Sequence, residues 1–231
     1  MELDKYIDLL IPRGSASLVN LVNEKARMPA ITGGIGVCHT YVDKSYELTK
    51  ALDIISNAKI QNPSVCNALD TILIHKDILE EFVDPMFDLL ADQNVEIRAD
   101  QKSFESYSKS PRNLLKLAKN SDFGEEFLDL ILSVKTVKNI DDAIAHIAEY
   151  GSGHSEAIIT DSENQAKYFL QKVDAGAVFH NTSTRFNDGF EFGLGAEVAV
   201  STDKMHARGP MGIKEIMTYK WQVFGSGQLR S

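Results

Sequence analysis

Cysteine is scarce in this chain, which has only Cys38 and Cys66 among its 231 residues. Two thiols without a metal-like spacing exclude a disulfide scaffold and a structural zinc centre, and they fit a reducing compartment. We therefore predict that the protein has no metal site and is soluble and cytoplasmic.

Long hydrophobic runs and an excess of basic residues are also missing. The run LILSV at residues 130–134 is far shorter than the roughly 20 apolar residues of a membrane-spanning helix. The first residues, MELDKYIDLLIPRG, mix acids and bases too early for a secretory signal. A net charge of −9 argues against the basic face that nucleic acids require. We predict neither a membrane nor a nucleic-acid partner.

Nucleotide-binding fingerprints are absent as well. The sequence contains no Gly-x-Gly-x-x-Gly pattern and no phosphate-binding P-loop. If the protein uses a nucleotide, most of that site is not encoded here in a recognisable form.

Strand-like and helix-like segments alternate along the chain. The predicted strands cover residues 6–12, 29–34, 71–75, 130–137, 156–160 and 176–181. The predicted helices cover residues 15–26, 44–59, 76–93 with an interruption or kink at Pro85, 139–151, and 161–175 with Asp161 as N-cap. This alternation predicts an α/β layer architecture with a largely parallel sheet, followed by a β-rich tail at residues 216–231.

Cys66 is the strongest candidate for chemistry. Asn62 can cap a helix and Pro63 suits its first position, which would place Cys66 in the first turn of a helix over residues 64–70. Exposed N–H groups and the helix dipole would then lower the pKa of the thiol and could stabilise an oxyanion. The alternative is a buried structural cysteine, which is the commoner fate of a free thiol.

The remaining candidates each have a plain structural alternative. Cys38 enters an apolar strand and is interpreted as packing, while Gly33, Gly34 and Gly36 indicate either a close backbone approach or a tight turn. His146 is interpreted as structural, whereas His154 lies in a glycine-containing loop where a functional side chain is more common.

Two loops late in the chain carry arginines that could bind an anion. The loop NTSTRF at residues 181–186 offers hydroxyls and Arg185, and HARGP at residues 206–210 offers Arg208. Either arginine could equally be structural. From the residues alone, the prediction ends at an α/β protein with an anion-binding thiol site.

The chain resembles the gamma-glutamyl phosphate reductase family of the aldehyde dehydrogenase superfamily. The resemblance is carried by DLLIPRG, PAITGGIGVCHTYVD, NPSVCNALDTILIH, VKNIDDAIAHIAEYGSGHSEAII, NTSTRFNDGFEFGLGAEVAVSTDKMHARGPMG and TYKWQVFGSGQLR. It covers the whole chain but only the C-terminal part of the family enzyme, which implies a piece of a longer protein. It also implies an aldehyde dehydrogenase-like catalytic domain at residues 37–210, a remnant of the dinucleotide-binding domain at residues 1–36, and an oligomerisation strand at residues 211–231.

The resemblance assigns roles to individual residues. It implies that Cys66 attacks L-glutamate 5-phosphate and that NADPH supplies the hydride, in the second step of proline biosynthesis from glutamate. The implied substrate contacts are Asn67, His154, Ser183, Thr184, Arg185 and Arg208. The implied cofactor contacts are Arg13, Gly14, Gly33, Gly34 and Glu126.

The resemblance also implies partners and an alternative. It implies a homo-oligomer and a functional link to glutamate 5-kinase. Oxidising relatives carry a glutamate base in the segment that corresponds to ITGGIGVCH, and this chain has no acid there. The alternative is a fragment that folds and oligomerises but does not bind NADPH productively.

Overall fold

A seven-stranded parallel sheet forms the centre of the computed structural model, which describes residues 1–31, 33, 35–109, 113–204 and 207–230. The strands lie in the order β4-β3-β5-β2-β1-β6-β7. Their bounds are β1 Cys38–Val42, β2 Leu69–His75, β3 Glu96–Ala99, β4 Leu115–Leu117, β5 Ile131–Val137, β6 Ser155–Ile159 and β7 Ala177–His180. All six strand pairs of this sheet are parallel, as the β-α alternation predicts.

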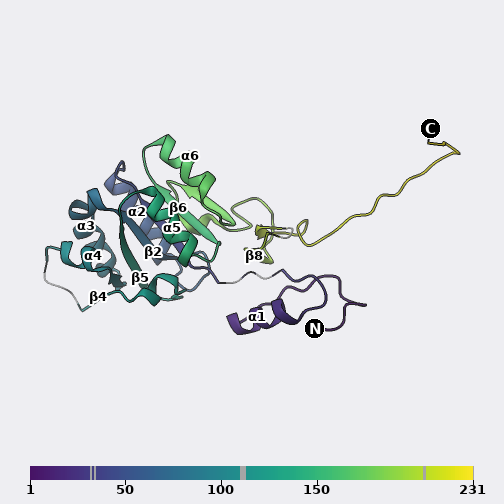
Figure 1. Ribbon diagram of the computed structural model, residues 1–231, viewed down its shortest axis with the longest axis horizontal. Helices are drawn as coiled ribbons and strands as arrows, with labels where there is room; N and C mark the ends of the chain where they lie inside the picture. The colour runs from purple at the N-terminus through teal and green to yellow at the C-terminus, as the bar shows by residue number, and fades with distance from the viewer. Residues whose placement is uncertain (32, 34, 110–112, 205–206, 231) are drawn as a thin grey trace.

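Helices cover both faces of the sheet (Figure 1). On one face α2 (Leu48–Ile60), α3 (Leu79–Asp92) and α4 (Gln101–Ser106) pack on the larger apolar core, to which β2, β3 and β5 also contribute. On the other face α5 (Ile140–Tyr150) and α6 (Glu163–Lys172) form a smaller core around Tyr41 and Phe169. The α/β class predicted from the sequence is therefore confirmed.

Local capping explains where these helices begin. The Asn139 side chain accepts from the N–H of Asp142 at the start of α5, and Gly151 follows its end. At α6 the cap is Ser162, which accepts from the N–H of Gln165, so the prediction that Asp161 caps this helix is wrong by one residue. The helix α3 continues through Pro85, so the predicted interruption does not occur.

Three predicted β-segments are not strands. Among the described residues of the segments 6–12 and 29–34, one isolated parallel bridge forms, between Leu10 and Ala30 on either side of α1 (Ala16–Lys25), and residues 32 and 34 lie outside the described residues. No strand forms over residues 212–230, where the tail is extended and leaves the body of the molecule (Figure 1). Each segment has the composition of a strand, but no neighbouring strand of the described residues completes a ladder with it.

The N-terminal segment contacts the chain near its other end. Ile31 packs with Ala199 and Met211, which belong to a small antiparallel pair, β8 (Ala199–Ser201) and β9 (Gly209–Met211). The Arg13 guanidinium donates to the carbonyl of Val198 over 3.1 Å. These contacts place Arg13 and Ile31 beside this small antiparallel pair.

Short helical turns complete the fold: η1 (Lys76–Ile78), η2 (Asn120–Gly124) and η3 (Thr184–Phe186). Among the helices of the described residues, none is long and apolar enough to cross a membrane.

Candidate active site

A cavity of about 550 Å³ opens at the amino ends of the sheet strands. Part of its lining comes from the segments just before β1, β2, β5 and β6, and parallel strands place these ends at one edge. The rest comes from the N-terminal segment, the loop after β7 and β8. Residues after β7 return to the same edge, because Thr184 and Asn187 bond to Asn67 and His154. Ligands of open α/β sheets usually bind at the carboxyl ends of strands, so the sequence pattern alone would have suggested the opposite edge.

Cys66 lines this cavity from a turn, not from a helix. The Asn62 side chain does accept from the N–H and hydroxyl of Ser64, but the turn leads directly into β2 and no helix follows. The helix that precedes the turn, α2, ends at Ile60, so the nearest helix terminus along the chain is a carboxyl end. The predicted helix over residues 64–70 is therefore wrong.

The electrostatic surroundings of Cys66 differ accordingly from the prediction. Burial raises the pKa of its thiol to about 11, and the carboxylates of Glu197 and Glu126 add to this increase. The Arg13 guanidinium acts in the opposite direction. In the structure of this chain the pKa of the thiol is raised and not lowered, because carboxylates and burial replace the expected helix amino terminus.

A network of polar groups holds the turn beside Cys66. The Asn67 amide donates to the carbonyls of Asn187 and Arg185, over 3.1 and 3.4 Å, and the Thr184 hydroxyl donates to the Asn67 carbonyl over 2.8 Å. The Asn187 amide in turn donates to the Ser155 hydroxyl over 2.8 Å. The loop after β7 thus fixes the backbone next to the thiol.

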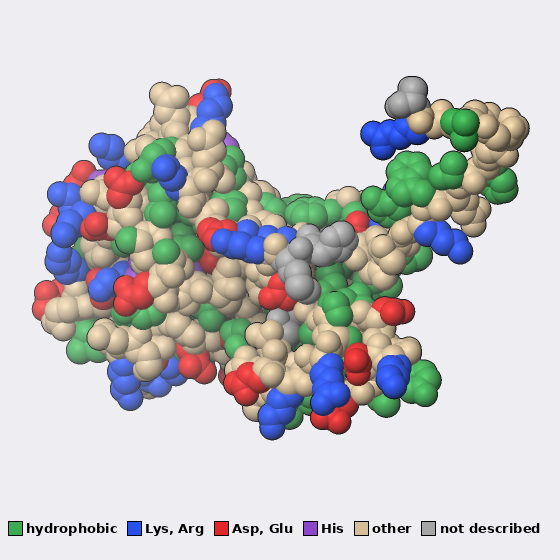
Figure 2. Space-filling model, turned by 45° about the vertical axis from the view of Figure 1, so that its right-hand side comes forward, with side chains coloured by type: hydrophobic (Ala, Val, Ile, Leu, Met, Phe, Trp, Pro, Cys, Tyr) green, Lys and Arg blue, Asp and Glu red, His purple; other side chains and the backbone are tan. Residues whose placement is uncertain are grey.

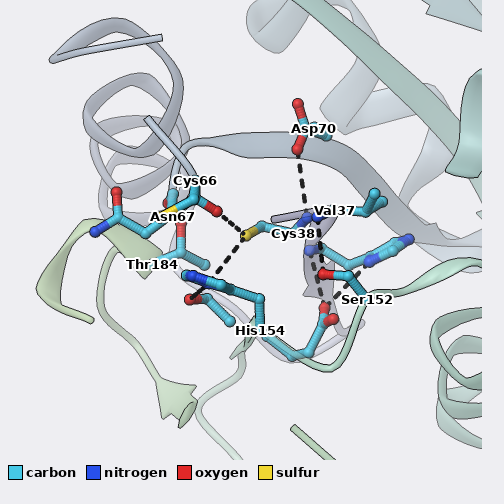
Figure 3. Close-up of polar contacts among 11 residues, drawn as sticks. Val37, Cys38, Cys66, Asn67, Asp70, Ser152, His154 and Thr184 are labelled. Carbon is cyan, nitrogen blue, oxygen red and sulfur yellow. Dashed lines mark hydrogen bonds and ion pairs between the residues drawn. The ribbon is translucent and has the colours of Figure 1, made fainter. Parts of the chain in front are cut away.

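Cys38 and His154 lie underneath this turn (Figure 3). The fully buried Cys38 thiol donates to the carbonyl of Cys66 over 3.2 Å and lies 4.0 Å from Nδ1 of His154. That nitrogen also lies 2.7 Å from the Ser155 hydroxyl. Burial lowers the pKa of His154 to about 4, so the ring is neutral near pH 7. Within the described residues, its Nε2 atom has no hydrogen-bond partner.

Glu126 connects the cavity to the glycine-rich segment before β1. Its carboxylate accepts from the N–H of Gly36 over 2.8 Å, and burial raises its pKa. A Cβ atom at Gly36 would lie only 1.6 Å from the carbonyl oxygen of Cys66, and one at Gly33 would lie 2.0 Å from that of Val200. These glycines permit a close approach of the chain to itself, which confirms that interpretation over a simple tight turn.

A buried charge pair supports the site from inside. The Asp70 carboxylate accepts from the N–H groups of Cys38 and Phe127, and it lies 3.7 Å from the Lys59 ammonium. Burial raises the pKa of Asp70 to about 6 in spite of that ammonium, and it lowers the pKa of Lys59. Asp70 thereby joins β1, β2 and the segment that carries Glu126.

The structure brings most of the predicted site residues together. Those that line the cavity are Cys66, Asn67, His154, Arg185, Arg13, Gly14, Gly33 and Glu126. Ser183 and Thr184 are buried behind it, and Gly34 lies outside the described residues. Arg208 does not line the cavity, because its guanidinium pairs with Asp174 over 2.6 Å on another part of the surface.

Sequence reasoning missed several residues that shape the site. Asp70 and Lys59 are buried charges within apolar elements, and Asp188 and Glu197 bring carboxylates to the cavity from the loop after β7. Asp70 and Lys59 could have been found from the sequence, because a charged residue inside an apolar strand or helix indicates a buried charge. The position of the second pair depends on the path of the segment at residues 181–198 between β7 and β8, and no periodicity encodes that path. Throughout the part of the chain that is described, no three His, Cys, Asp or Glu residues group as metal ligands would.

The sequence is similar to known proteins of one enzyme family. The sequence profile of the aldehyde dehydrogenase family matches residues 117–221. A gamma-glutamyl phosphate reductase of Dehalococcoides mccartyi is 50% identical over 230 residues, covering 100% of this chain and 54% of that protein. The enzyme of the same name from Proteus mirabilis is 49% identical and is covered to 55%. The chain thus spans about half the length of the curated relatives it matches.

Solved structures show the same relationship. The crystal structure of gamma-glutamyl phosphate reductase from Thermotoga maritima superposes with a TM-score of 0.93 at 43% identity, covering 99% of this chain and 54% of that one. An acetylating aldehyde dehydrogenase from Geobacillus thermoglucosidasius has a TM-score of 0.70 at 19% identity over 97% of this chain and 58% of that one, which shows a shared fold.

Proposed function

Because this chain is a relative of the gamma-glutamyl phosphate reductases within the aldehyde dehydrogenase family, we propose that it provides the catalytic thiol and substrate cavity for reduction of L-glutamate 5-phosphate to L-glutamate 5-semialdehyde. The observation that carries the proposal is the cavity itself. It joins a partly buried cysteine, a neutral histidine and an arginine on a chain that matches these enzymes along its whole length.

Cys66 is the proposed nucleophile. Its thiolate attacks the acyl carbon, phosphate leaves with the electrons of the C–O bond, and a thioester on Cys66 remains. Addition of hydride to the thioester carbon gives a thiohemiacetal, whose collapse releases the semialdehyde and restores the thiolate. NADPH, when bound, supplies that hydride.

The raised pKa of Cys66 requires a proton acceptor for the first step. His154 is neutral near pH 7, lines the same cavity and has a ring nitrogen without a partner within the described residues. With a pKa of about 4 its ring is too weak a base to hold the thiol proton, so we assign it a hydrogen bond to the substrate and propose that the proton leaves with the departing phosphate. The Asn67 side chain and the Arg185 guanidinium lie in the same wall and can orient the acyl group.

We propose that the cavity also accepts one end of a nicotinamide cofactor. Glu126 holds a carboxylate at the wall, where it can accept hydrogen bonds from ribose hydroxyls, and Arg13 adds a positive charge that a phosphate group would favour. The backbone near Gly14 and Gly33 lines the same side. The proposed site remains incomplete within the described residues, which contain no glycine-rich phosphate loop.

The wall of the cavity before β1 favours reduction over hydrolysis. Its segment, residues 31–39, contains no carboxylate that could activate water against the thioester. The carboxylates that line the cavity from other segments are Glu126, Asp188 and Glu197. In the proposed complex Glu126 is hydrogen-bonded to the cofactor ribose, and the thioester persists until hydride is delivered. We therefore propose the reductive step of proline biosynthesis in the cytoplasm, downstream of the kinase that makes the acyl phosphate, glutamate 5-kinase.

The test is phosphate-dependent oxidation of L-glutamate 5-semialdehyde with NADP⁺, the reverse reaction. It is measured on this chain and on a chimera in which the chain replaces the matching half of the Dehalococcoides mccartyi relative. We expect the chimera to be active and the Cys66→Ala variant to lose at least about 10³-fold in kcat. Activity that survives Cys66→Ala would exclude the assignment.

A second candidate function follows from the 54% coverage of the relatives. In that case the chain folds and oligomerises but does not bind NADPH productively. The same assay separates the two, because an inactive chain beside an active chimera supports the fragment interpretation. An isolated chain that turns over at the rate of the chimera would exclude it.

A further inference from the structure

Two carboxylates in the cavity wall are not used by the proposed mechanism. Asp188 and Glu197 both line the cavity, and Glu197 is the charged group that contributes most to raising the pKa of Cys66. A carboxylate near a thiol that must ionise opposes the chemistry. The Arg13 guanidinium, which lowers the pKa of both Cys66 and Glu197, offsets this effect only in part, and a positive group that arrives with the substrate would offset more of it.

The same short loop fixes both carboxylates. One oxygen of Asp188 accepts from the N–H of Phe190 over 2.8 Å, and one oxygen of Glu197 accepts from the N–H of Gly189 over 2.8 Å. The two groups are close enough for Asp188 to raise the pKa of Glu197. The remaining oxygen of each carboxylate accepts no hydrogen bond in the described part of the chain, so each can accept one from a ligand.

A positively charged side chain, Arg185, lies close to these carboxylates in the sequence. Arg185 lines the cavity three residues before Asp188, and its Nε atom donates to the Gln61 side chain over 3.0 Å, which orients the guanidinium. The wall thus presents one guanidinium and two carboxylates, the complement of an amino acid's carboxylate and ammonium groups. A second observation indicates a ligand in this cavity: His154 is fully buried and lines it, and within the described residues its Nε2 atom has no partner.

We propose that Asp188 and Glu197 bind the α-ammonium of the substrate while Arg185 binds its α-carboxylate. The inference rests on the proposed function and deepens it, because it makes this loop the element that selects acyl groups derived from an amino acid. Binding of the ammonium also neutralises the carboxylates that oppose ionisation of Cys66. Substrate recognition and activation of the thiol are thereby coupled.

Calorimetric titration of the chain with L-glutamate and with glutarate, which lacks only the ammonium group, tests the subsite directly. We expect the parent chain to prefer L-glutamate. Asp188→Asn and Glu197→Gln should each weaken L-glutamate binding by roughly 10-fold and leave glutarate binding unchanged, because each removes one charge-assisted contact to the ammonium. The matched control is Glu191→Gln, which removes an exposed carboxylate of the same loop that does not line the cavity. This control should affect neither ligand.

Kinetics of the chimera separate this inference from the proposed function. The two carboxylate variants should lose roughly 10–100-fold in kcat/KM for L-glutamate 5-semialdehyde, and much less for 5-oxopentanoate, which has no ammonium group. Equal losses for both aldehydes, or no preference for L-glutamate in the titration, would overturn the subsite. If the chimera oxidises neither aldehyde while the binding preference still depends on Asp188 and Glu197, the proposed reaction fails and the subsite stands.

Discussion

At the scale of single residues, the site is built around a thiol that the fold does not activate by itself. Cys66 lines the cavity with a pKa of about 11, and its surroundings contain more negative than positive charge. Buried Cys38 beneath it has a pKa raised well above the ordinary value, chiefly by burial. The pKa of each thiol is therefore raised, and the two differ in access, since only Cys66 lines the cavity.

This difference predicts the outcome of alkylation with iodoacetamide. Cys66 should react faster than Cys38, because only Cys66 lines the cavity. Its rate should rise about tenfold per pH unit from pH 7 to pH 10, because the thiolate fraction rises in that proportion below the pKa. Peptide mass spectrometry gives both rates, and a Cys66→Ser variant shows the contribution of Cys38. A rate for Cys66 that is already constant at pH 7 would contradict the raised pKa.

The pair of Lys59 and Asp70 is the second feature at this scale. Burial keeps the folded-state pKa of Asp70 near 6, above the ordinary value of 3.8, so its contribution to stability is greatest below pH 4 and declines as pH rises through 6. Above that pH the ionised carboxylate depends on the neighbouring ammonium and on two N–H groups.

Removal of one partner from this pair should be costly. We expect Asp70→Asn to lower the free energy of unfolding at pH 7 by about 3 kcal/mol, because it leaves the Lys59 ammonium buried without a counter-charge. The double variant Lys59→Met/Asp70→Asn should recover part of that loss. Urea unfolding of the parent, of the single variants Asp70→Asn and Lys59→Met and of the double variant gives four free energies, and strict additivity of the two single changes would show that the pair is not coupled.

At the scale of elements, the site is produced by close contacts between chain segments. The backbone of the segment before β1 packs closely against the turn before β2. The loop after β7 contacts the same turn, where the Thr184 hydroxyl donates to the Asn67 carbonyl. Gly36 is the point of closest approach, where its backbone meets the peptide of Cys66.

A methyl group at this point should displace the thiol. Gly36→Ala should abolish the activity of the chimera and change the alkylation rate of Cys66, because a Cβ atom there would overlap the carbonyl of Cys66. Gly124→Ala is the matched control, since its Cβ atom would lie 3.6 Å from the nearest side chain, an ordinary contact. Normal alkylation and activity of Gly36→Ala would mean that this approach is not needed to position Cys66.

At the scale of the whole molecule, the most prominent feature is the C-terminal arm. Residues 213–230 extend from the body and carry exposed apolar side chains (Figure 2). Trp221 and Phe224 are 85% and 93% exposed. Contiguous apolar surface of this kind is typical of a segment that pairs with another chain, and the role of residues 211–231 in oligomerisation stays a prediction.

The arm yields a prediction about assembly. The double variant Trp221→Glu/Phe224→Glu should shift the chain toward a smaller species in analytical ultracentrifugation, because two charges would enter an apolar contact. Its thermal midpoint at low concentration should stay unchanged, since the arm packs on no core of its own protomer. The control is Lys220→Ala at a neighbouring exposed position, and an unchanged sedimentation profile of the double variant would exclude the arm as an interface.

The sequence predicted most strands of the central sheet and the helices that cover it. It did not predict whether the other strand-like segments find a neighbouring strand to pair with. The strands β2, β5, β6 and β7 and the helices α2, α3, α5 and α6 follow from periodicity and caps, because those signals are local. Residues 6–12 and the tail have equally strand-like composition, yet a strand exists only where another strand pairs with it. The short elements α4 and β4 lie in a polar stretch without the hydrophobic periodicity that would predict a helix or a strand.

The sequence by itself determined the α/β class and the scarcity of thiols, because composition and local periodicity are properties of the chain alone, and its resemblance to a known family singled out Cys66 as the residue to test. Only the tertiary structure decided that Cys66 lies on a turn at the amino ends of the strands and that carboxylates raise its pKa. The reason is physical: burial and the approach of Glu197, Glu126 and Arg13 depend on how distant segments fold together.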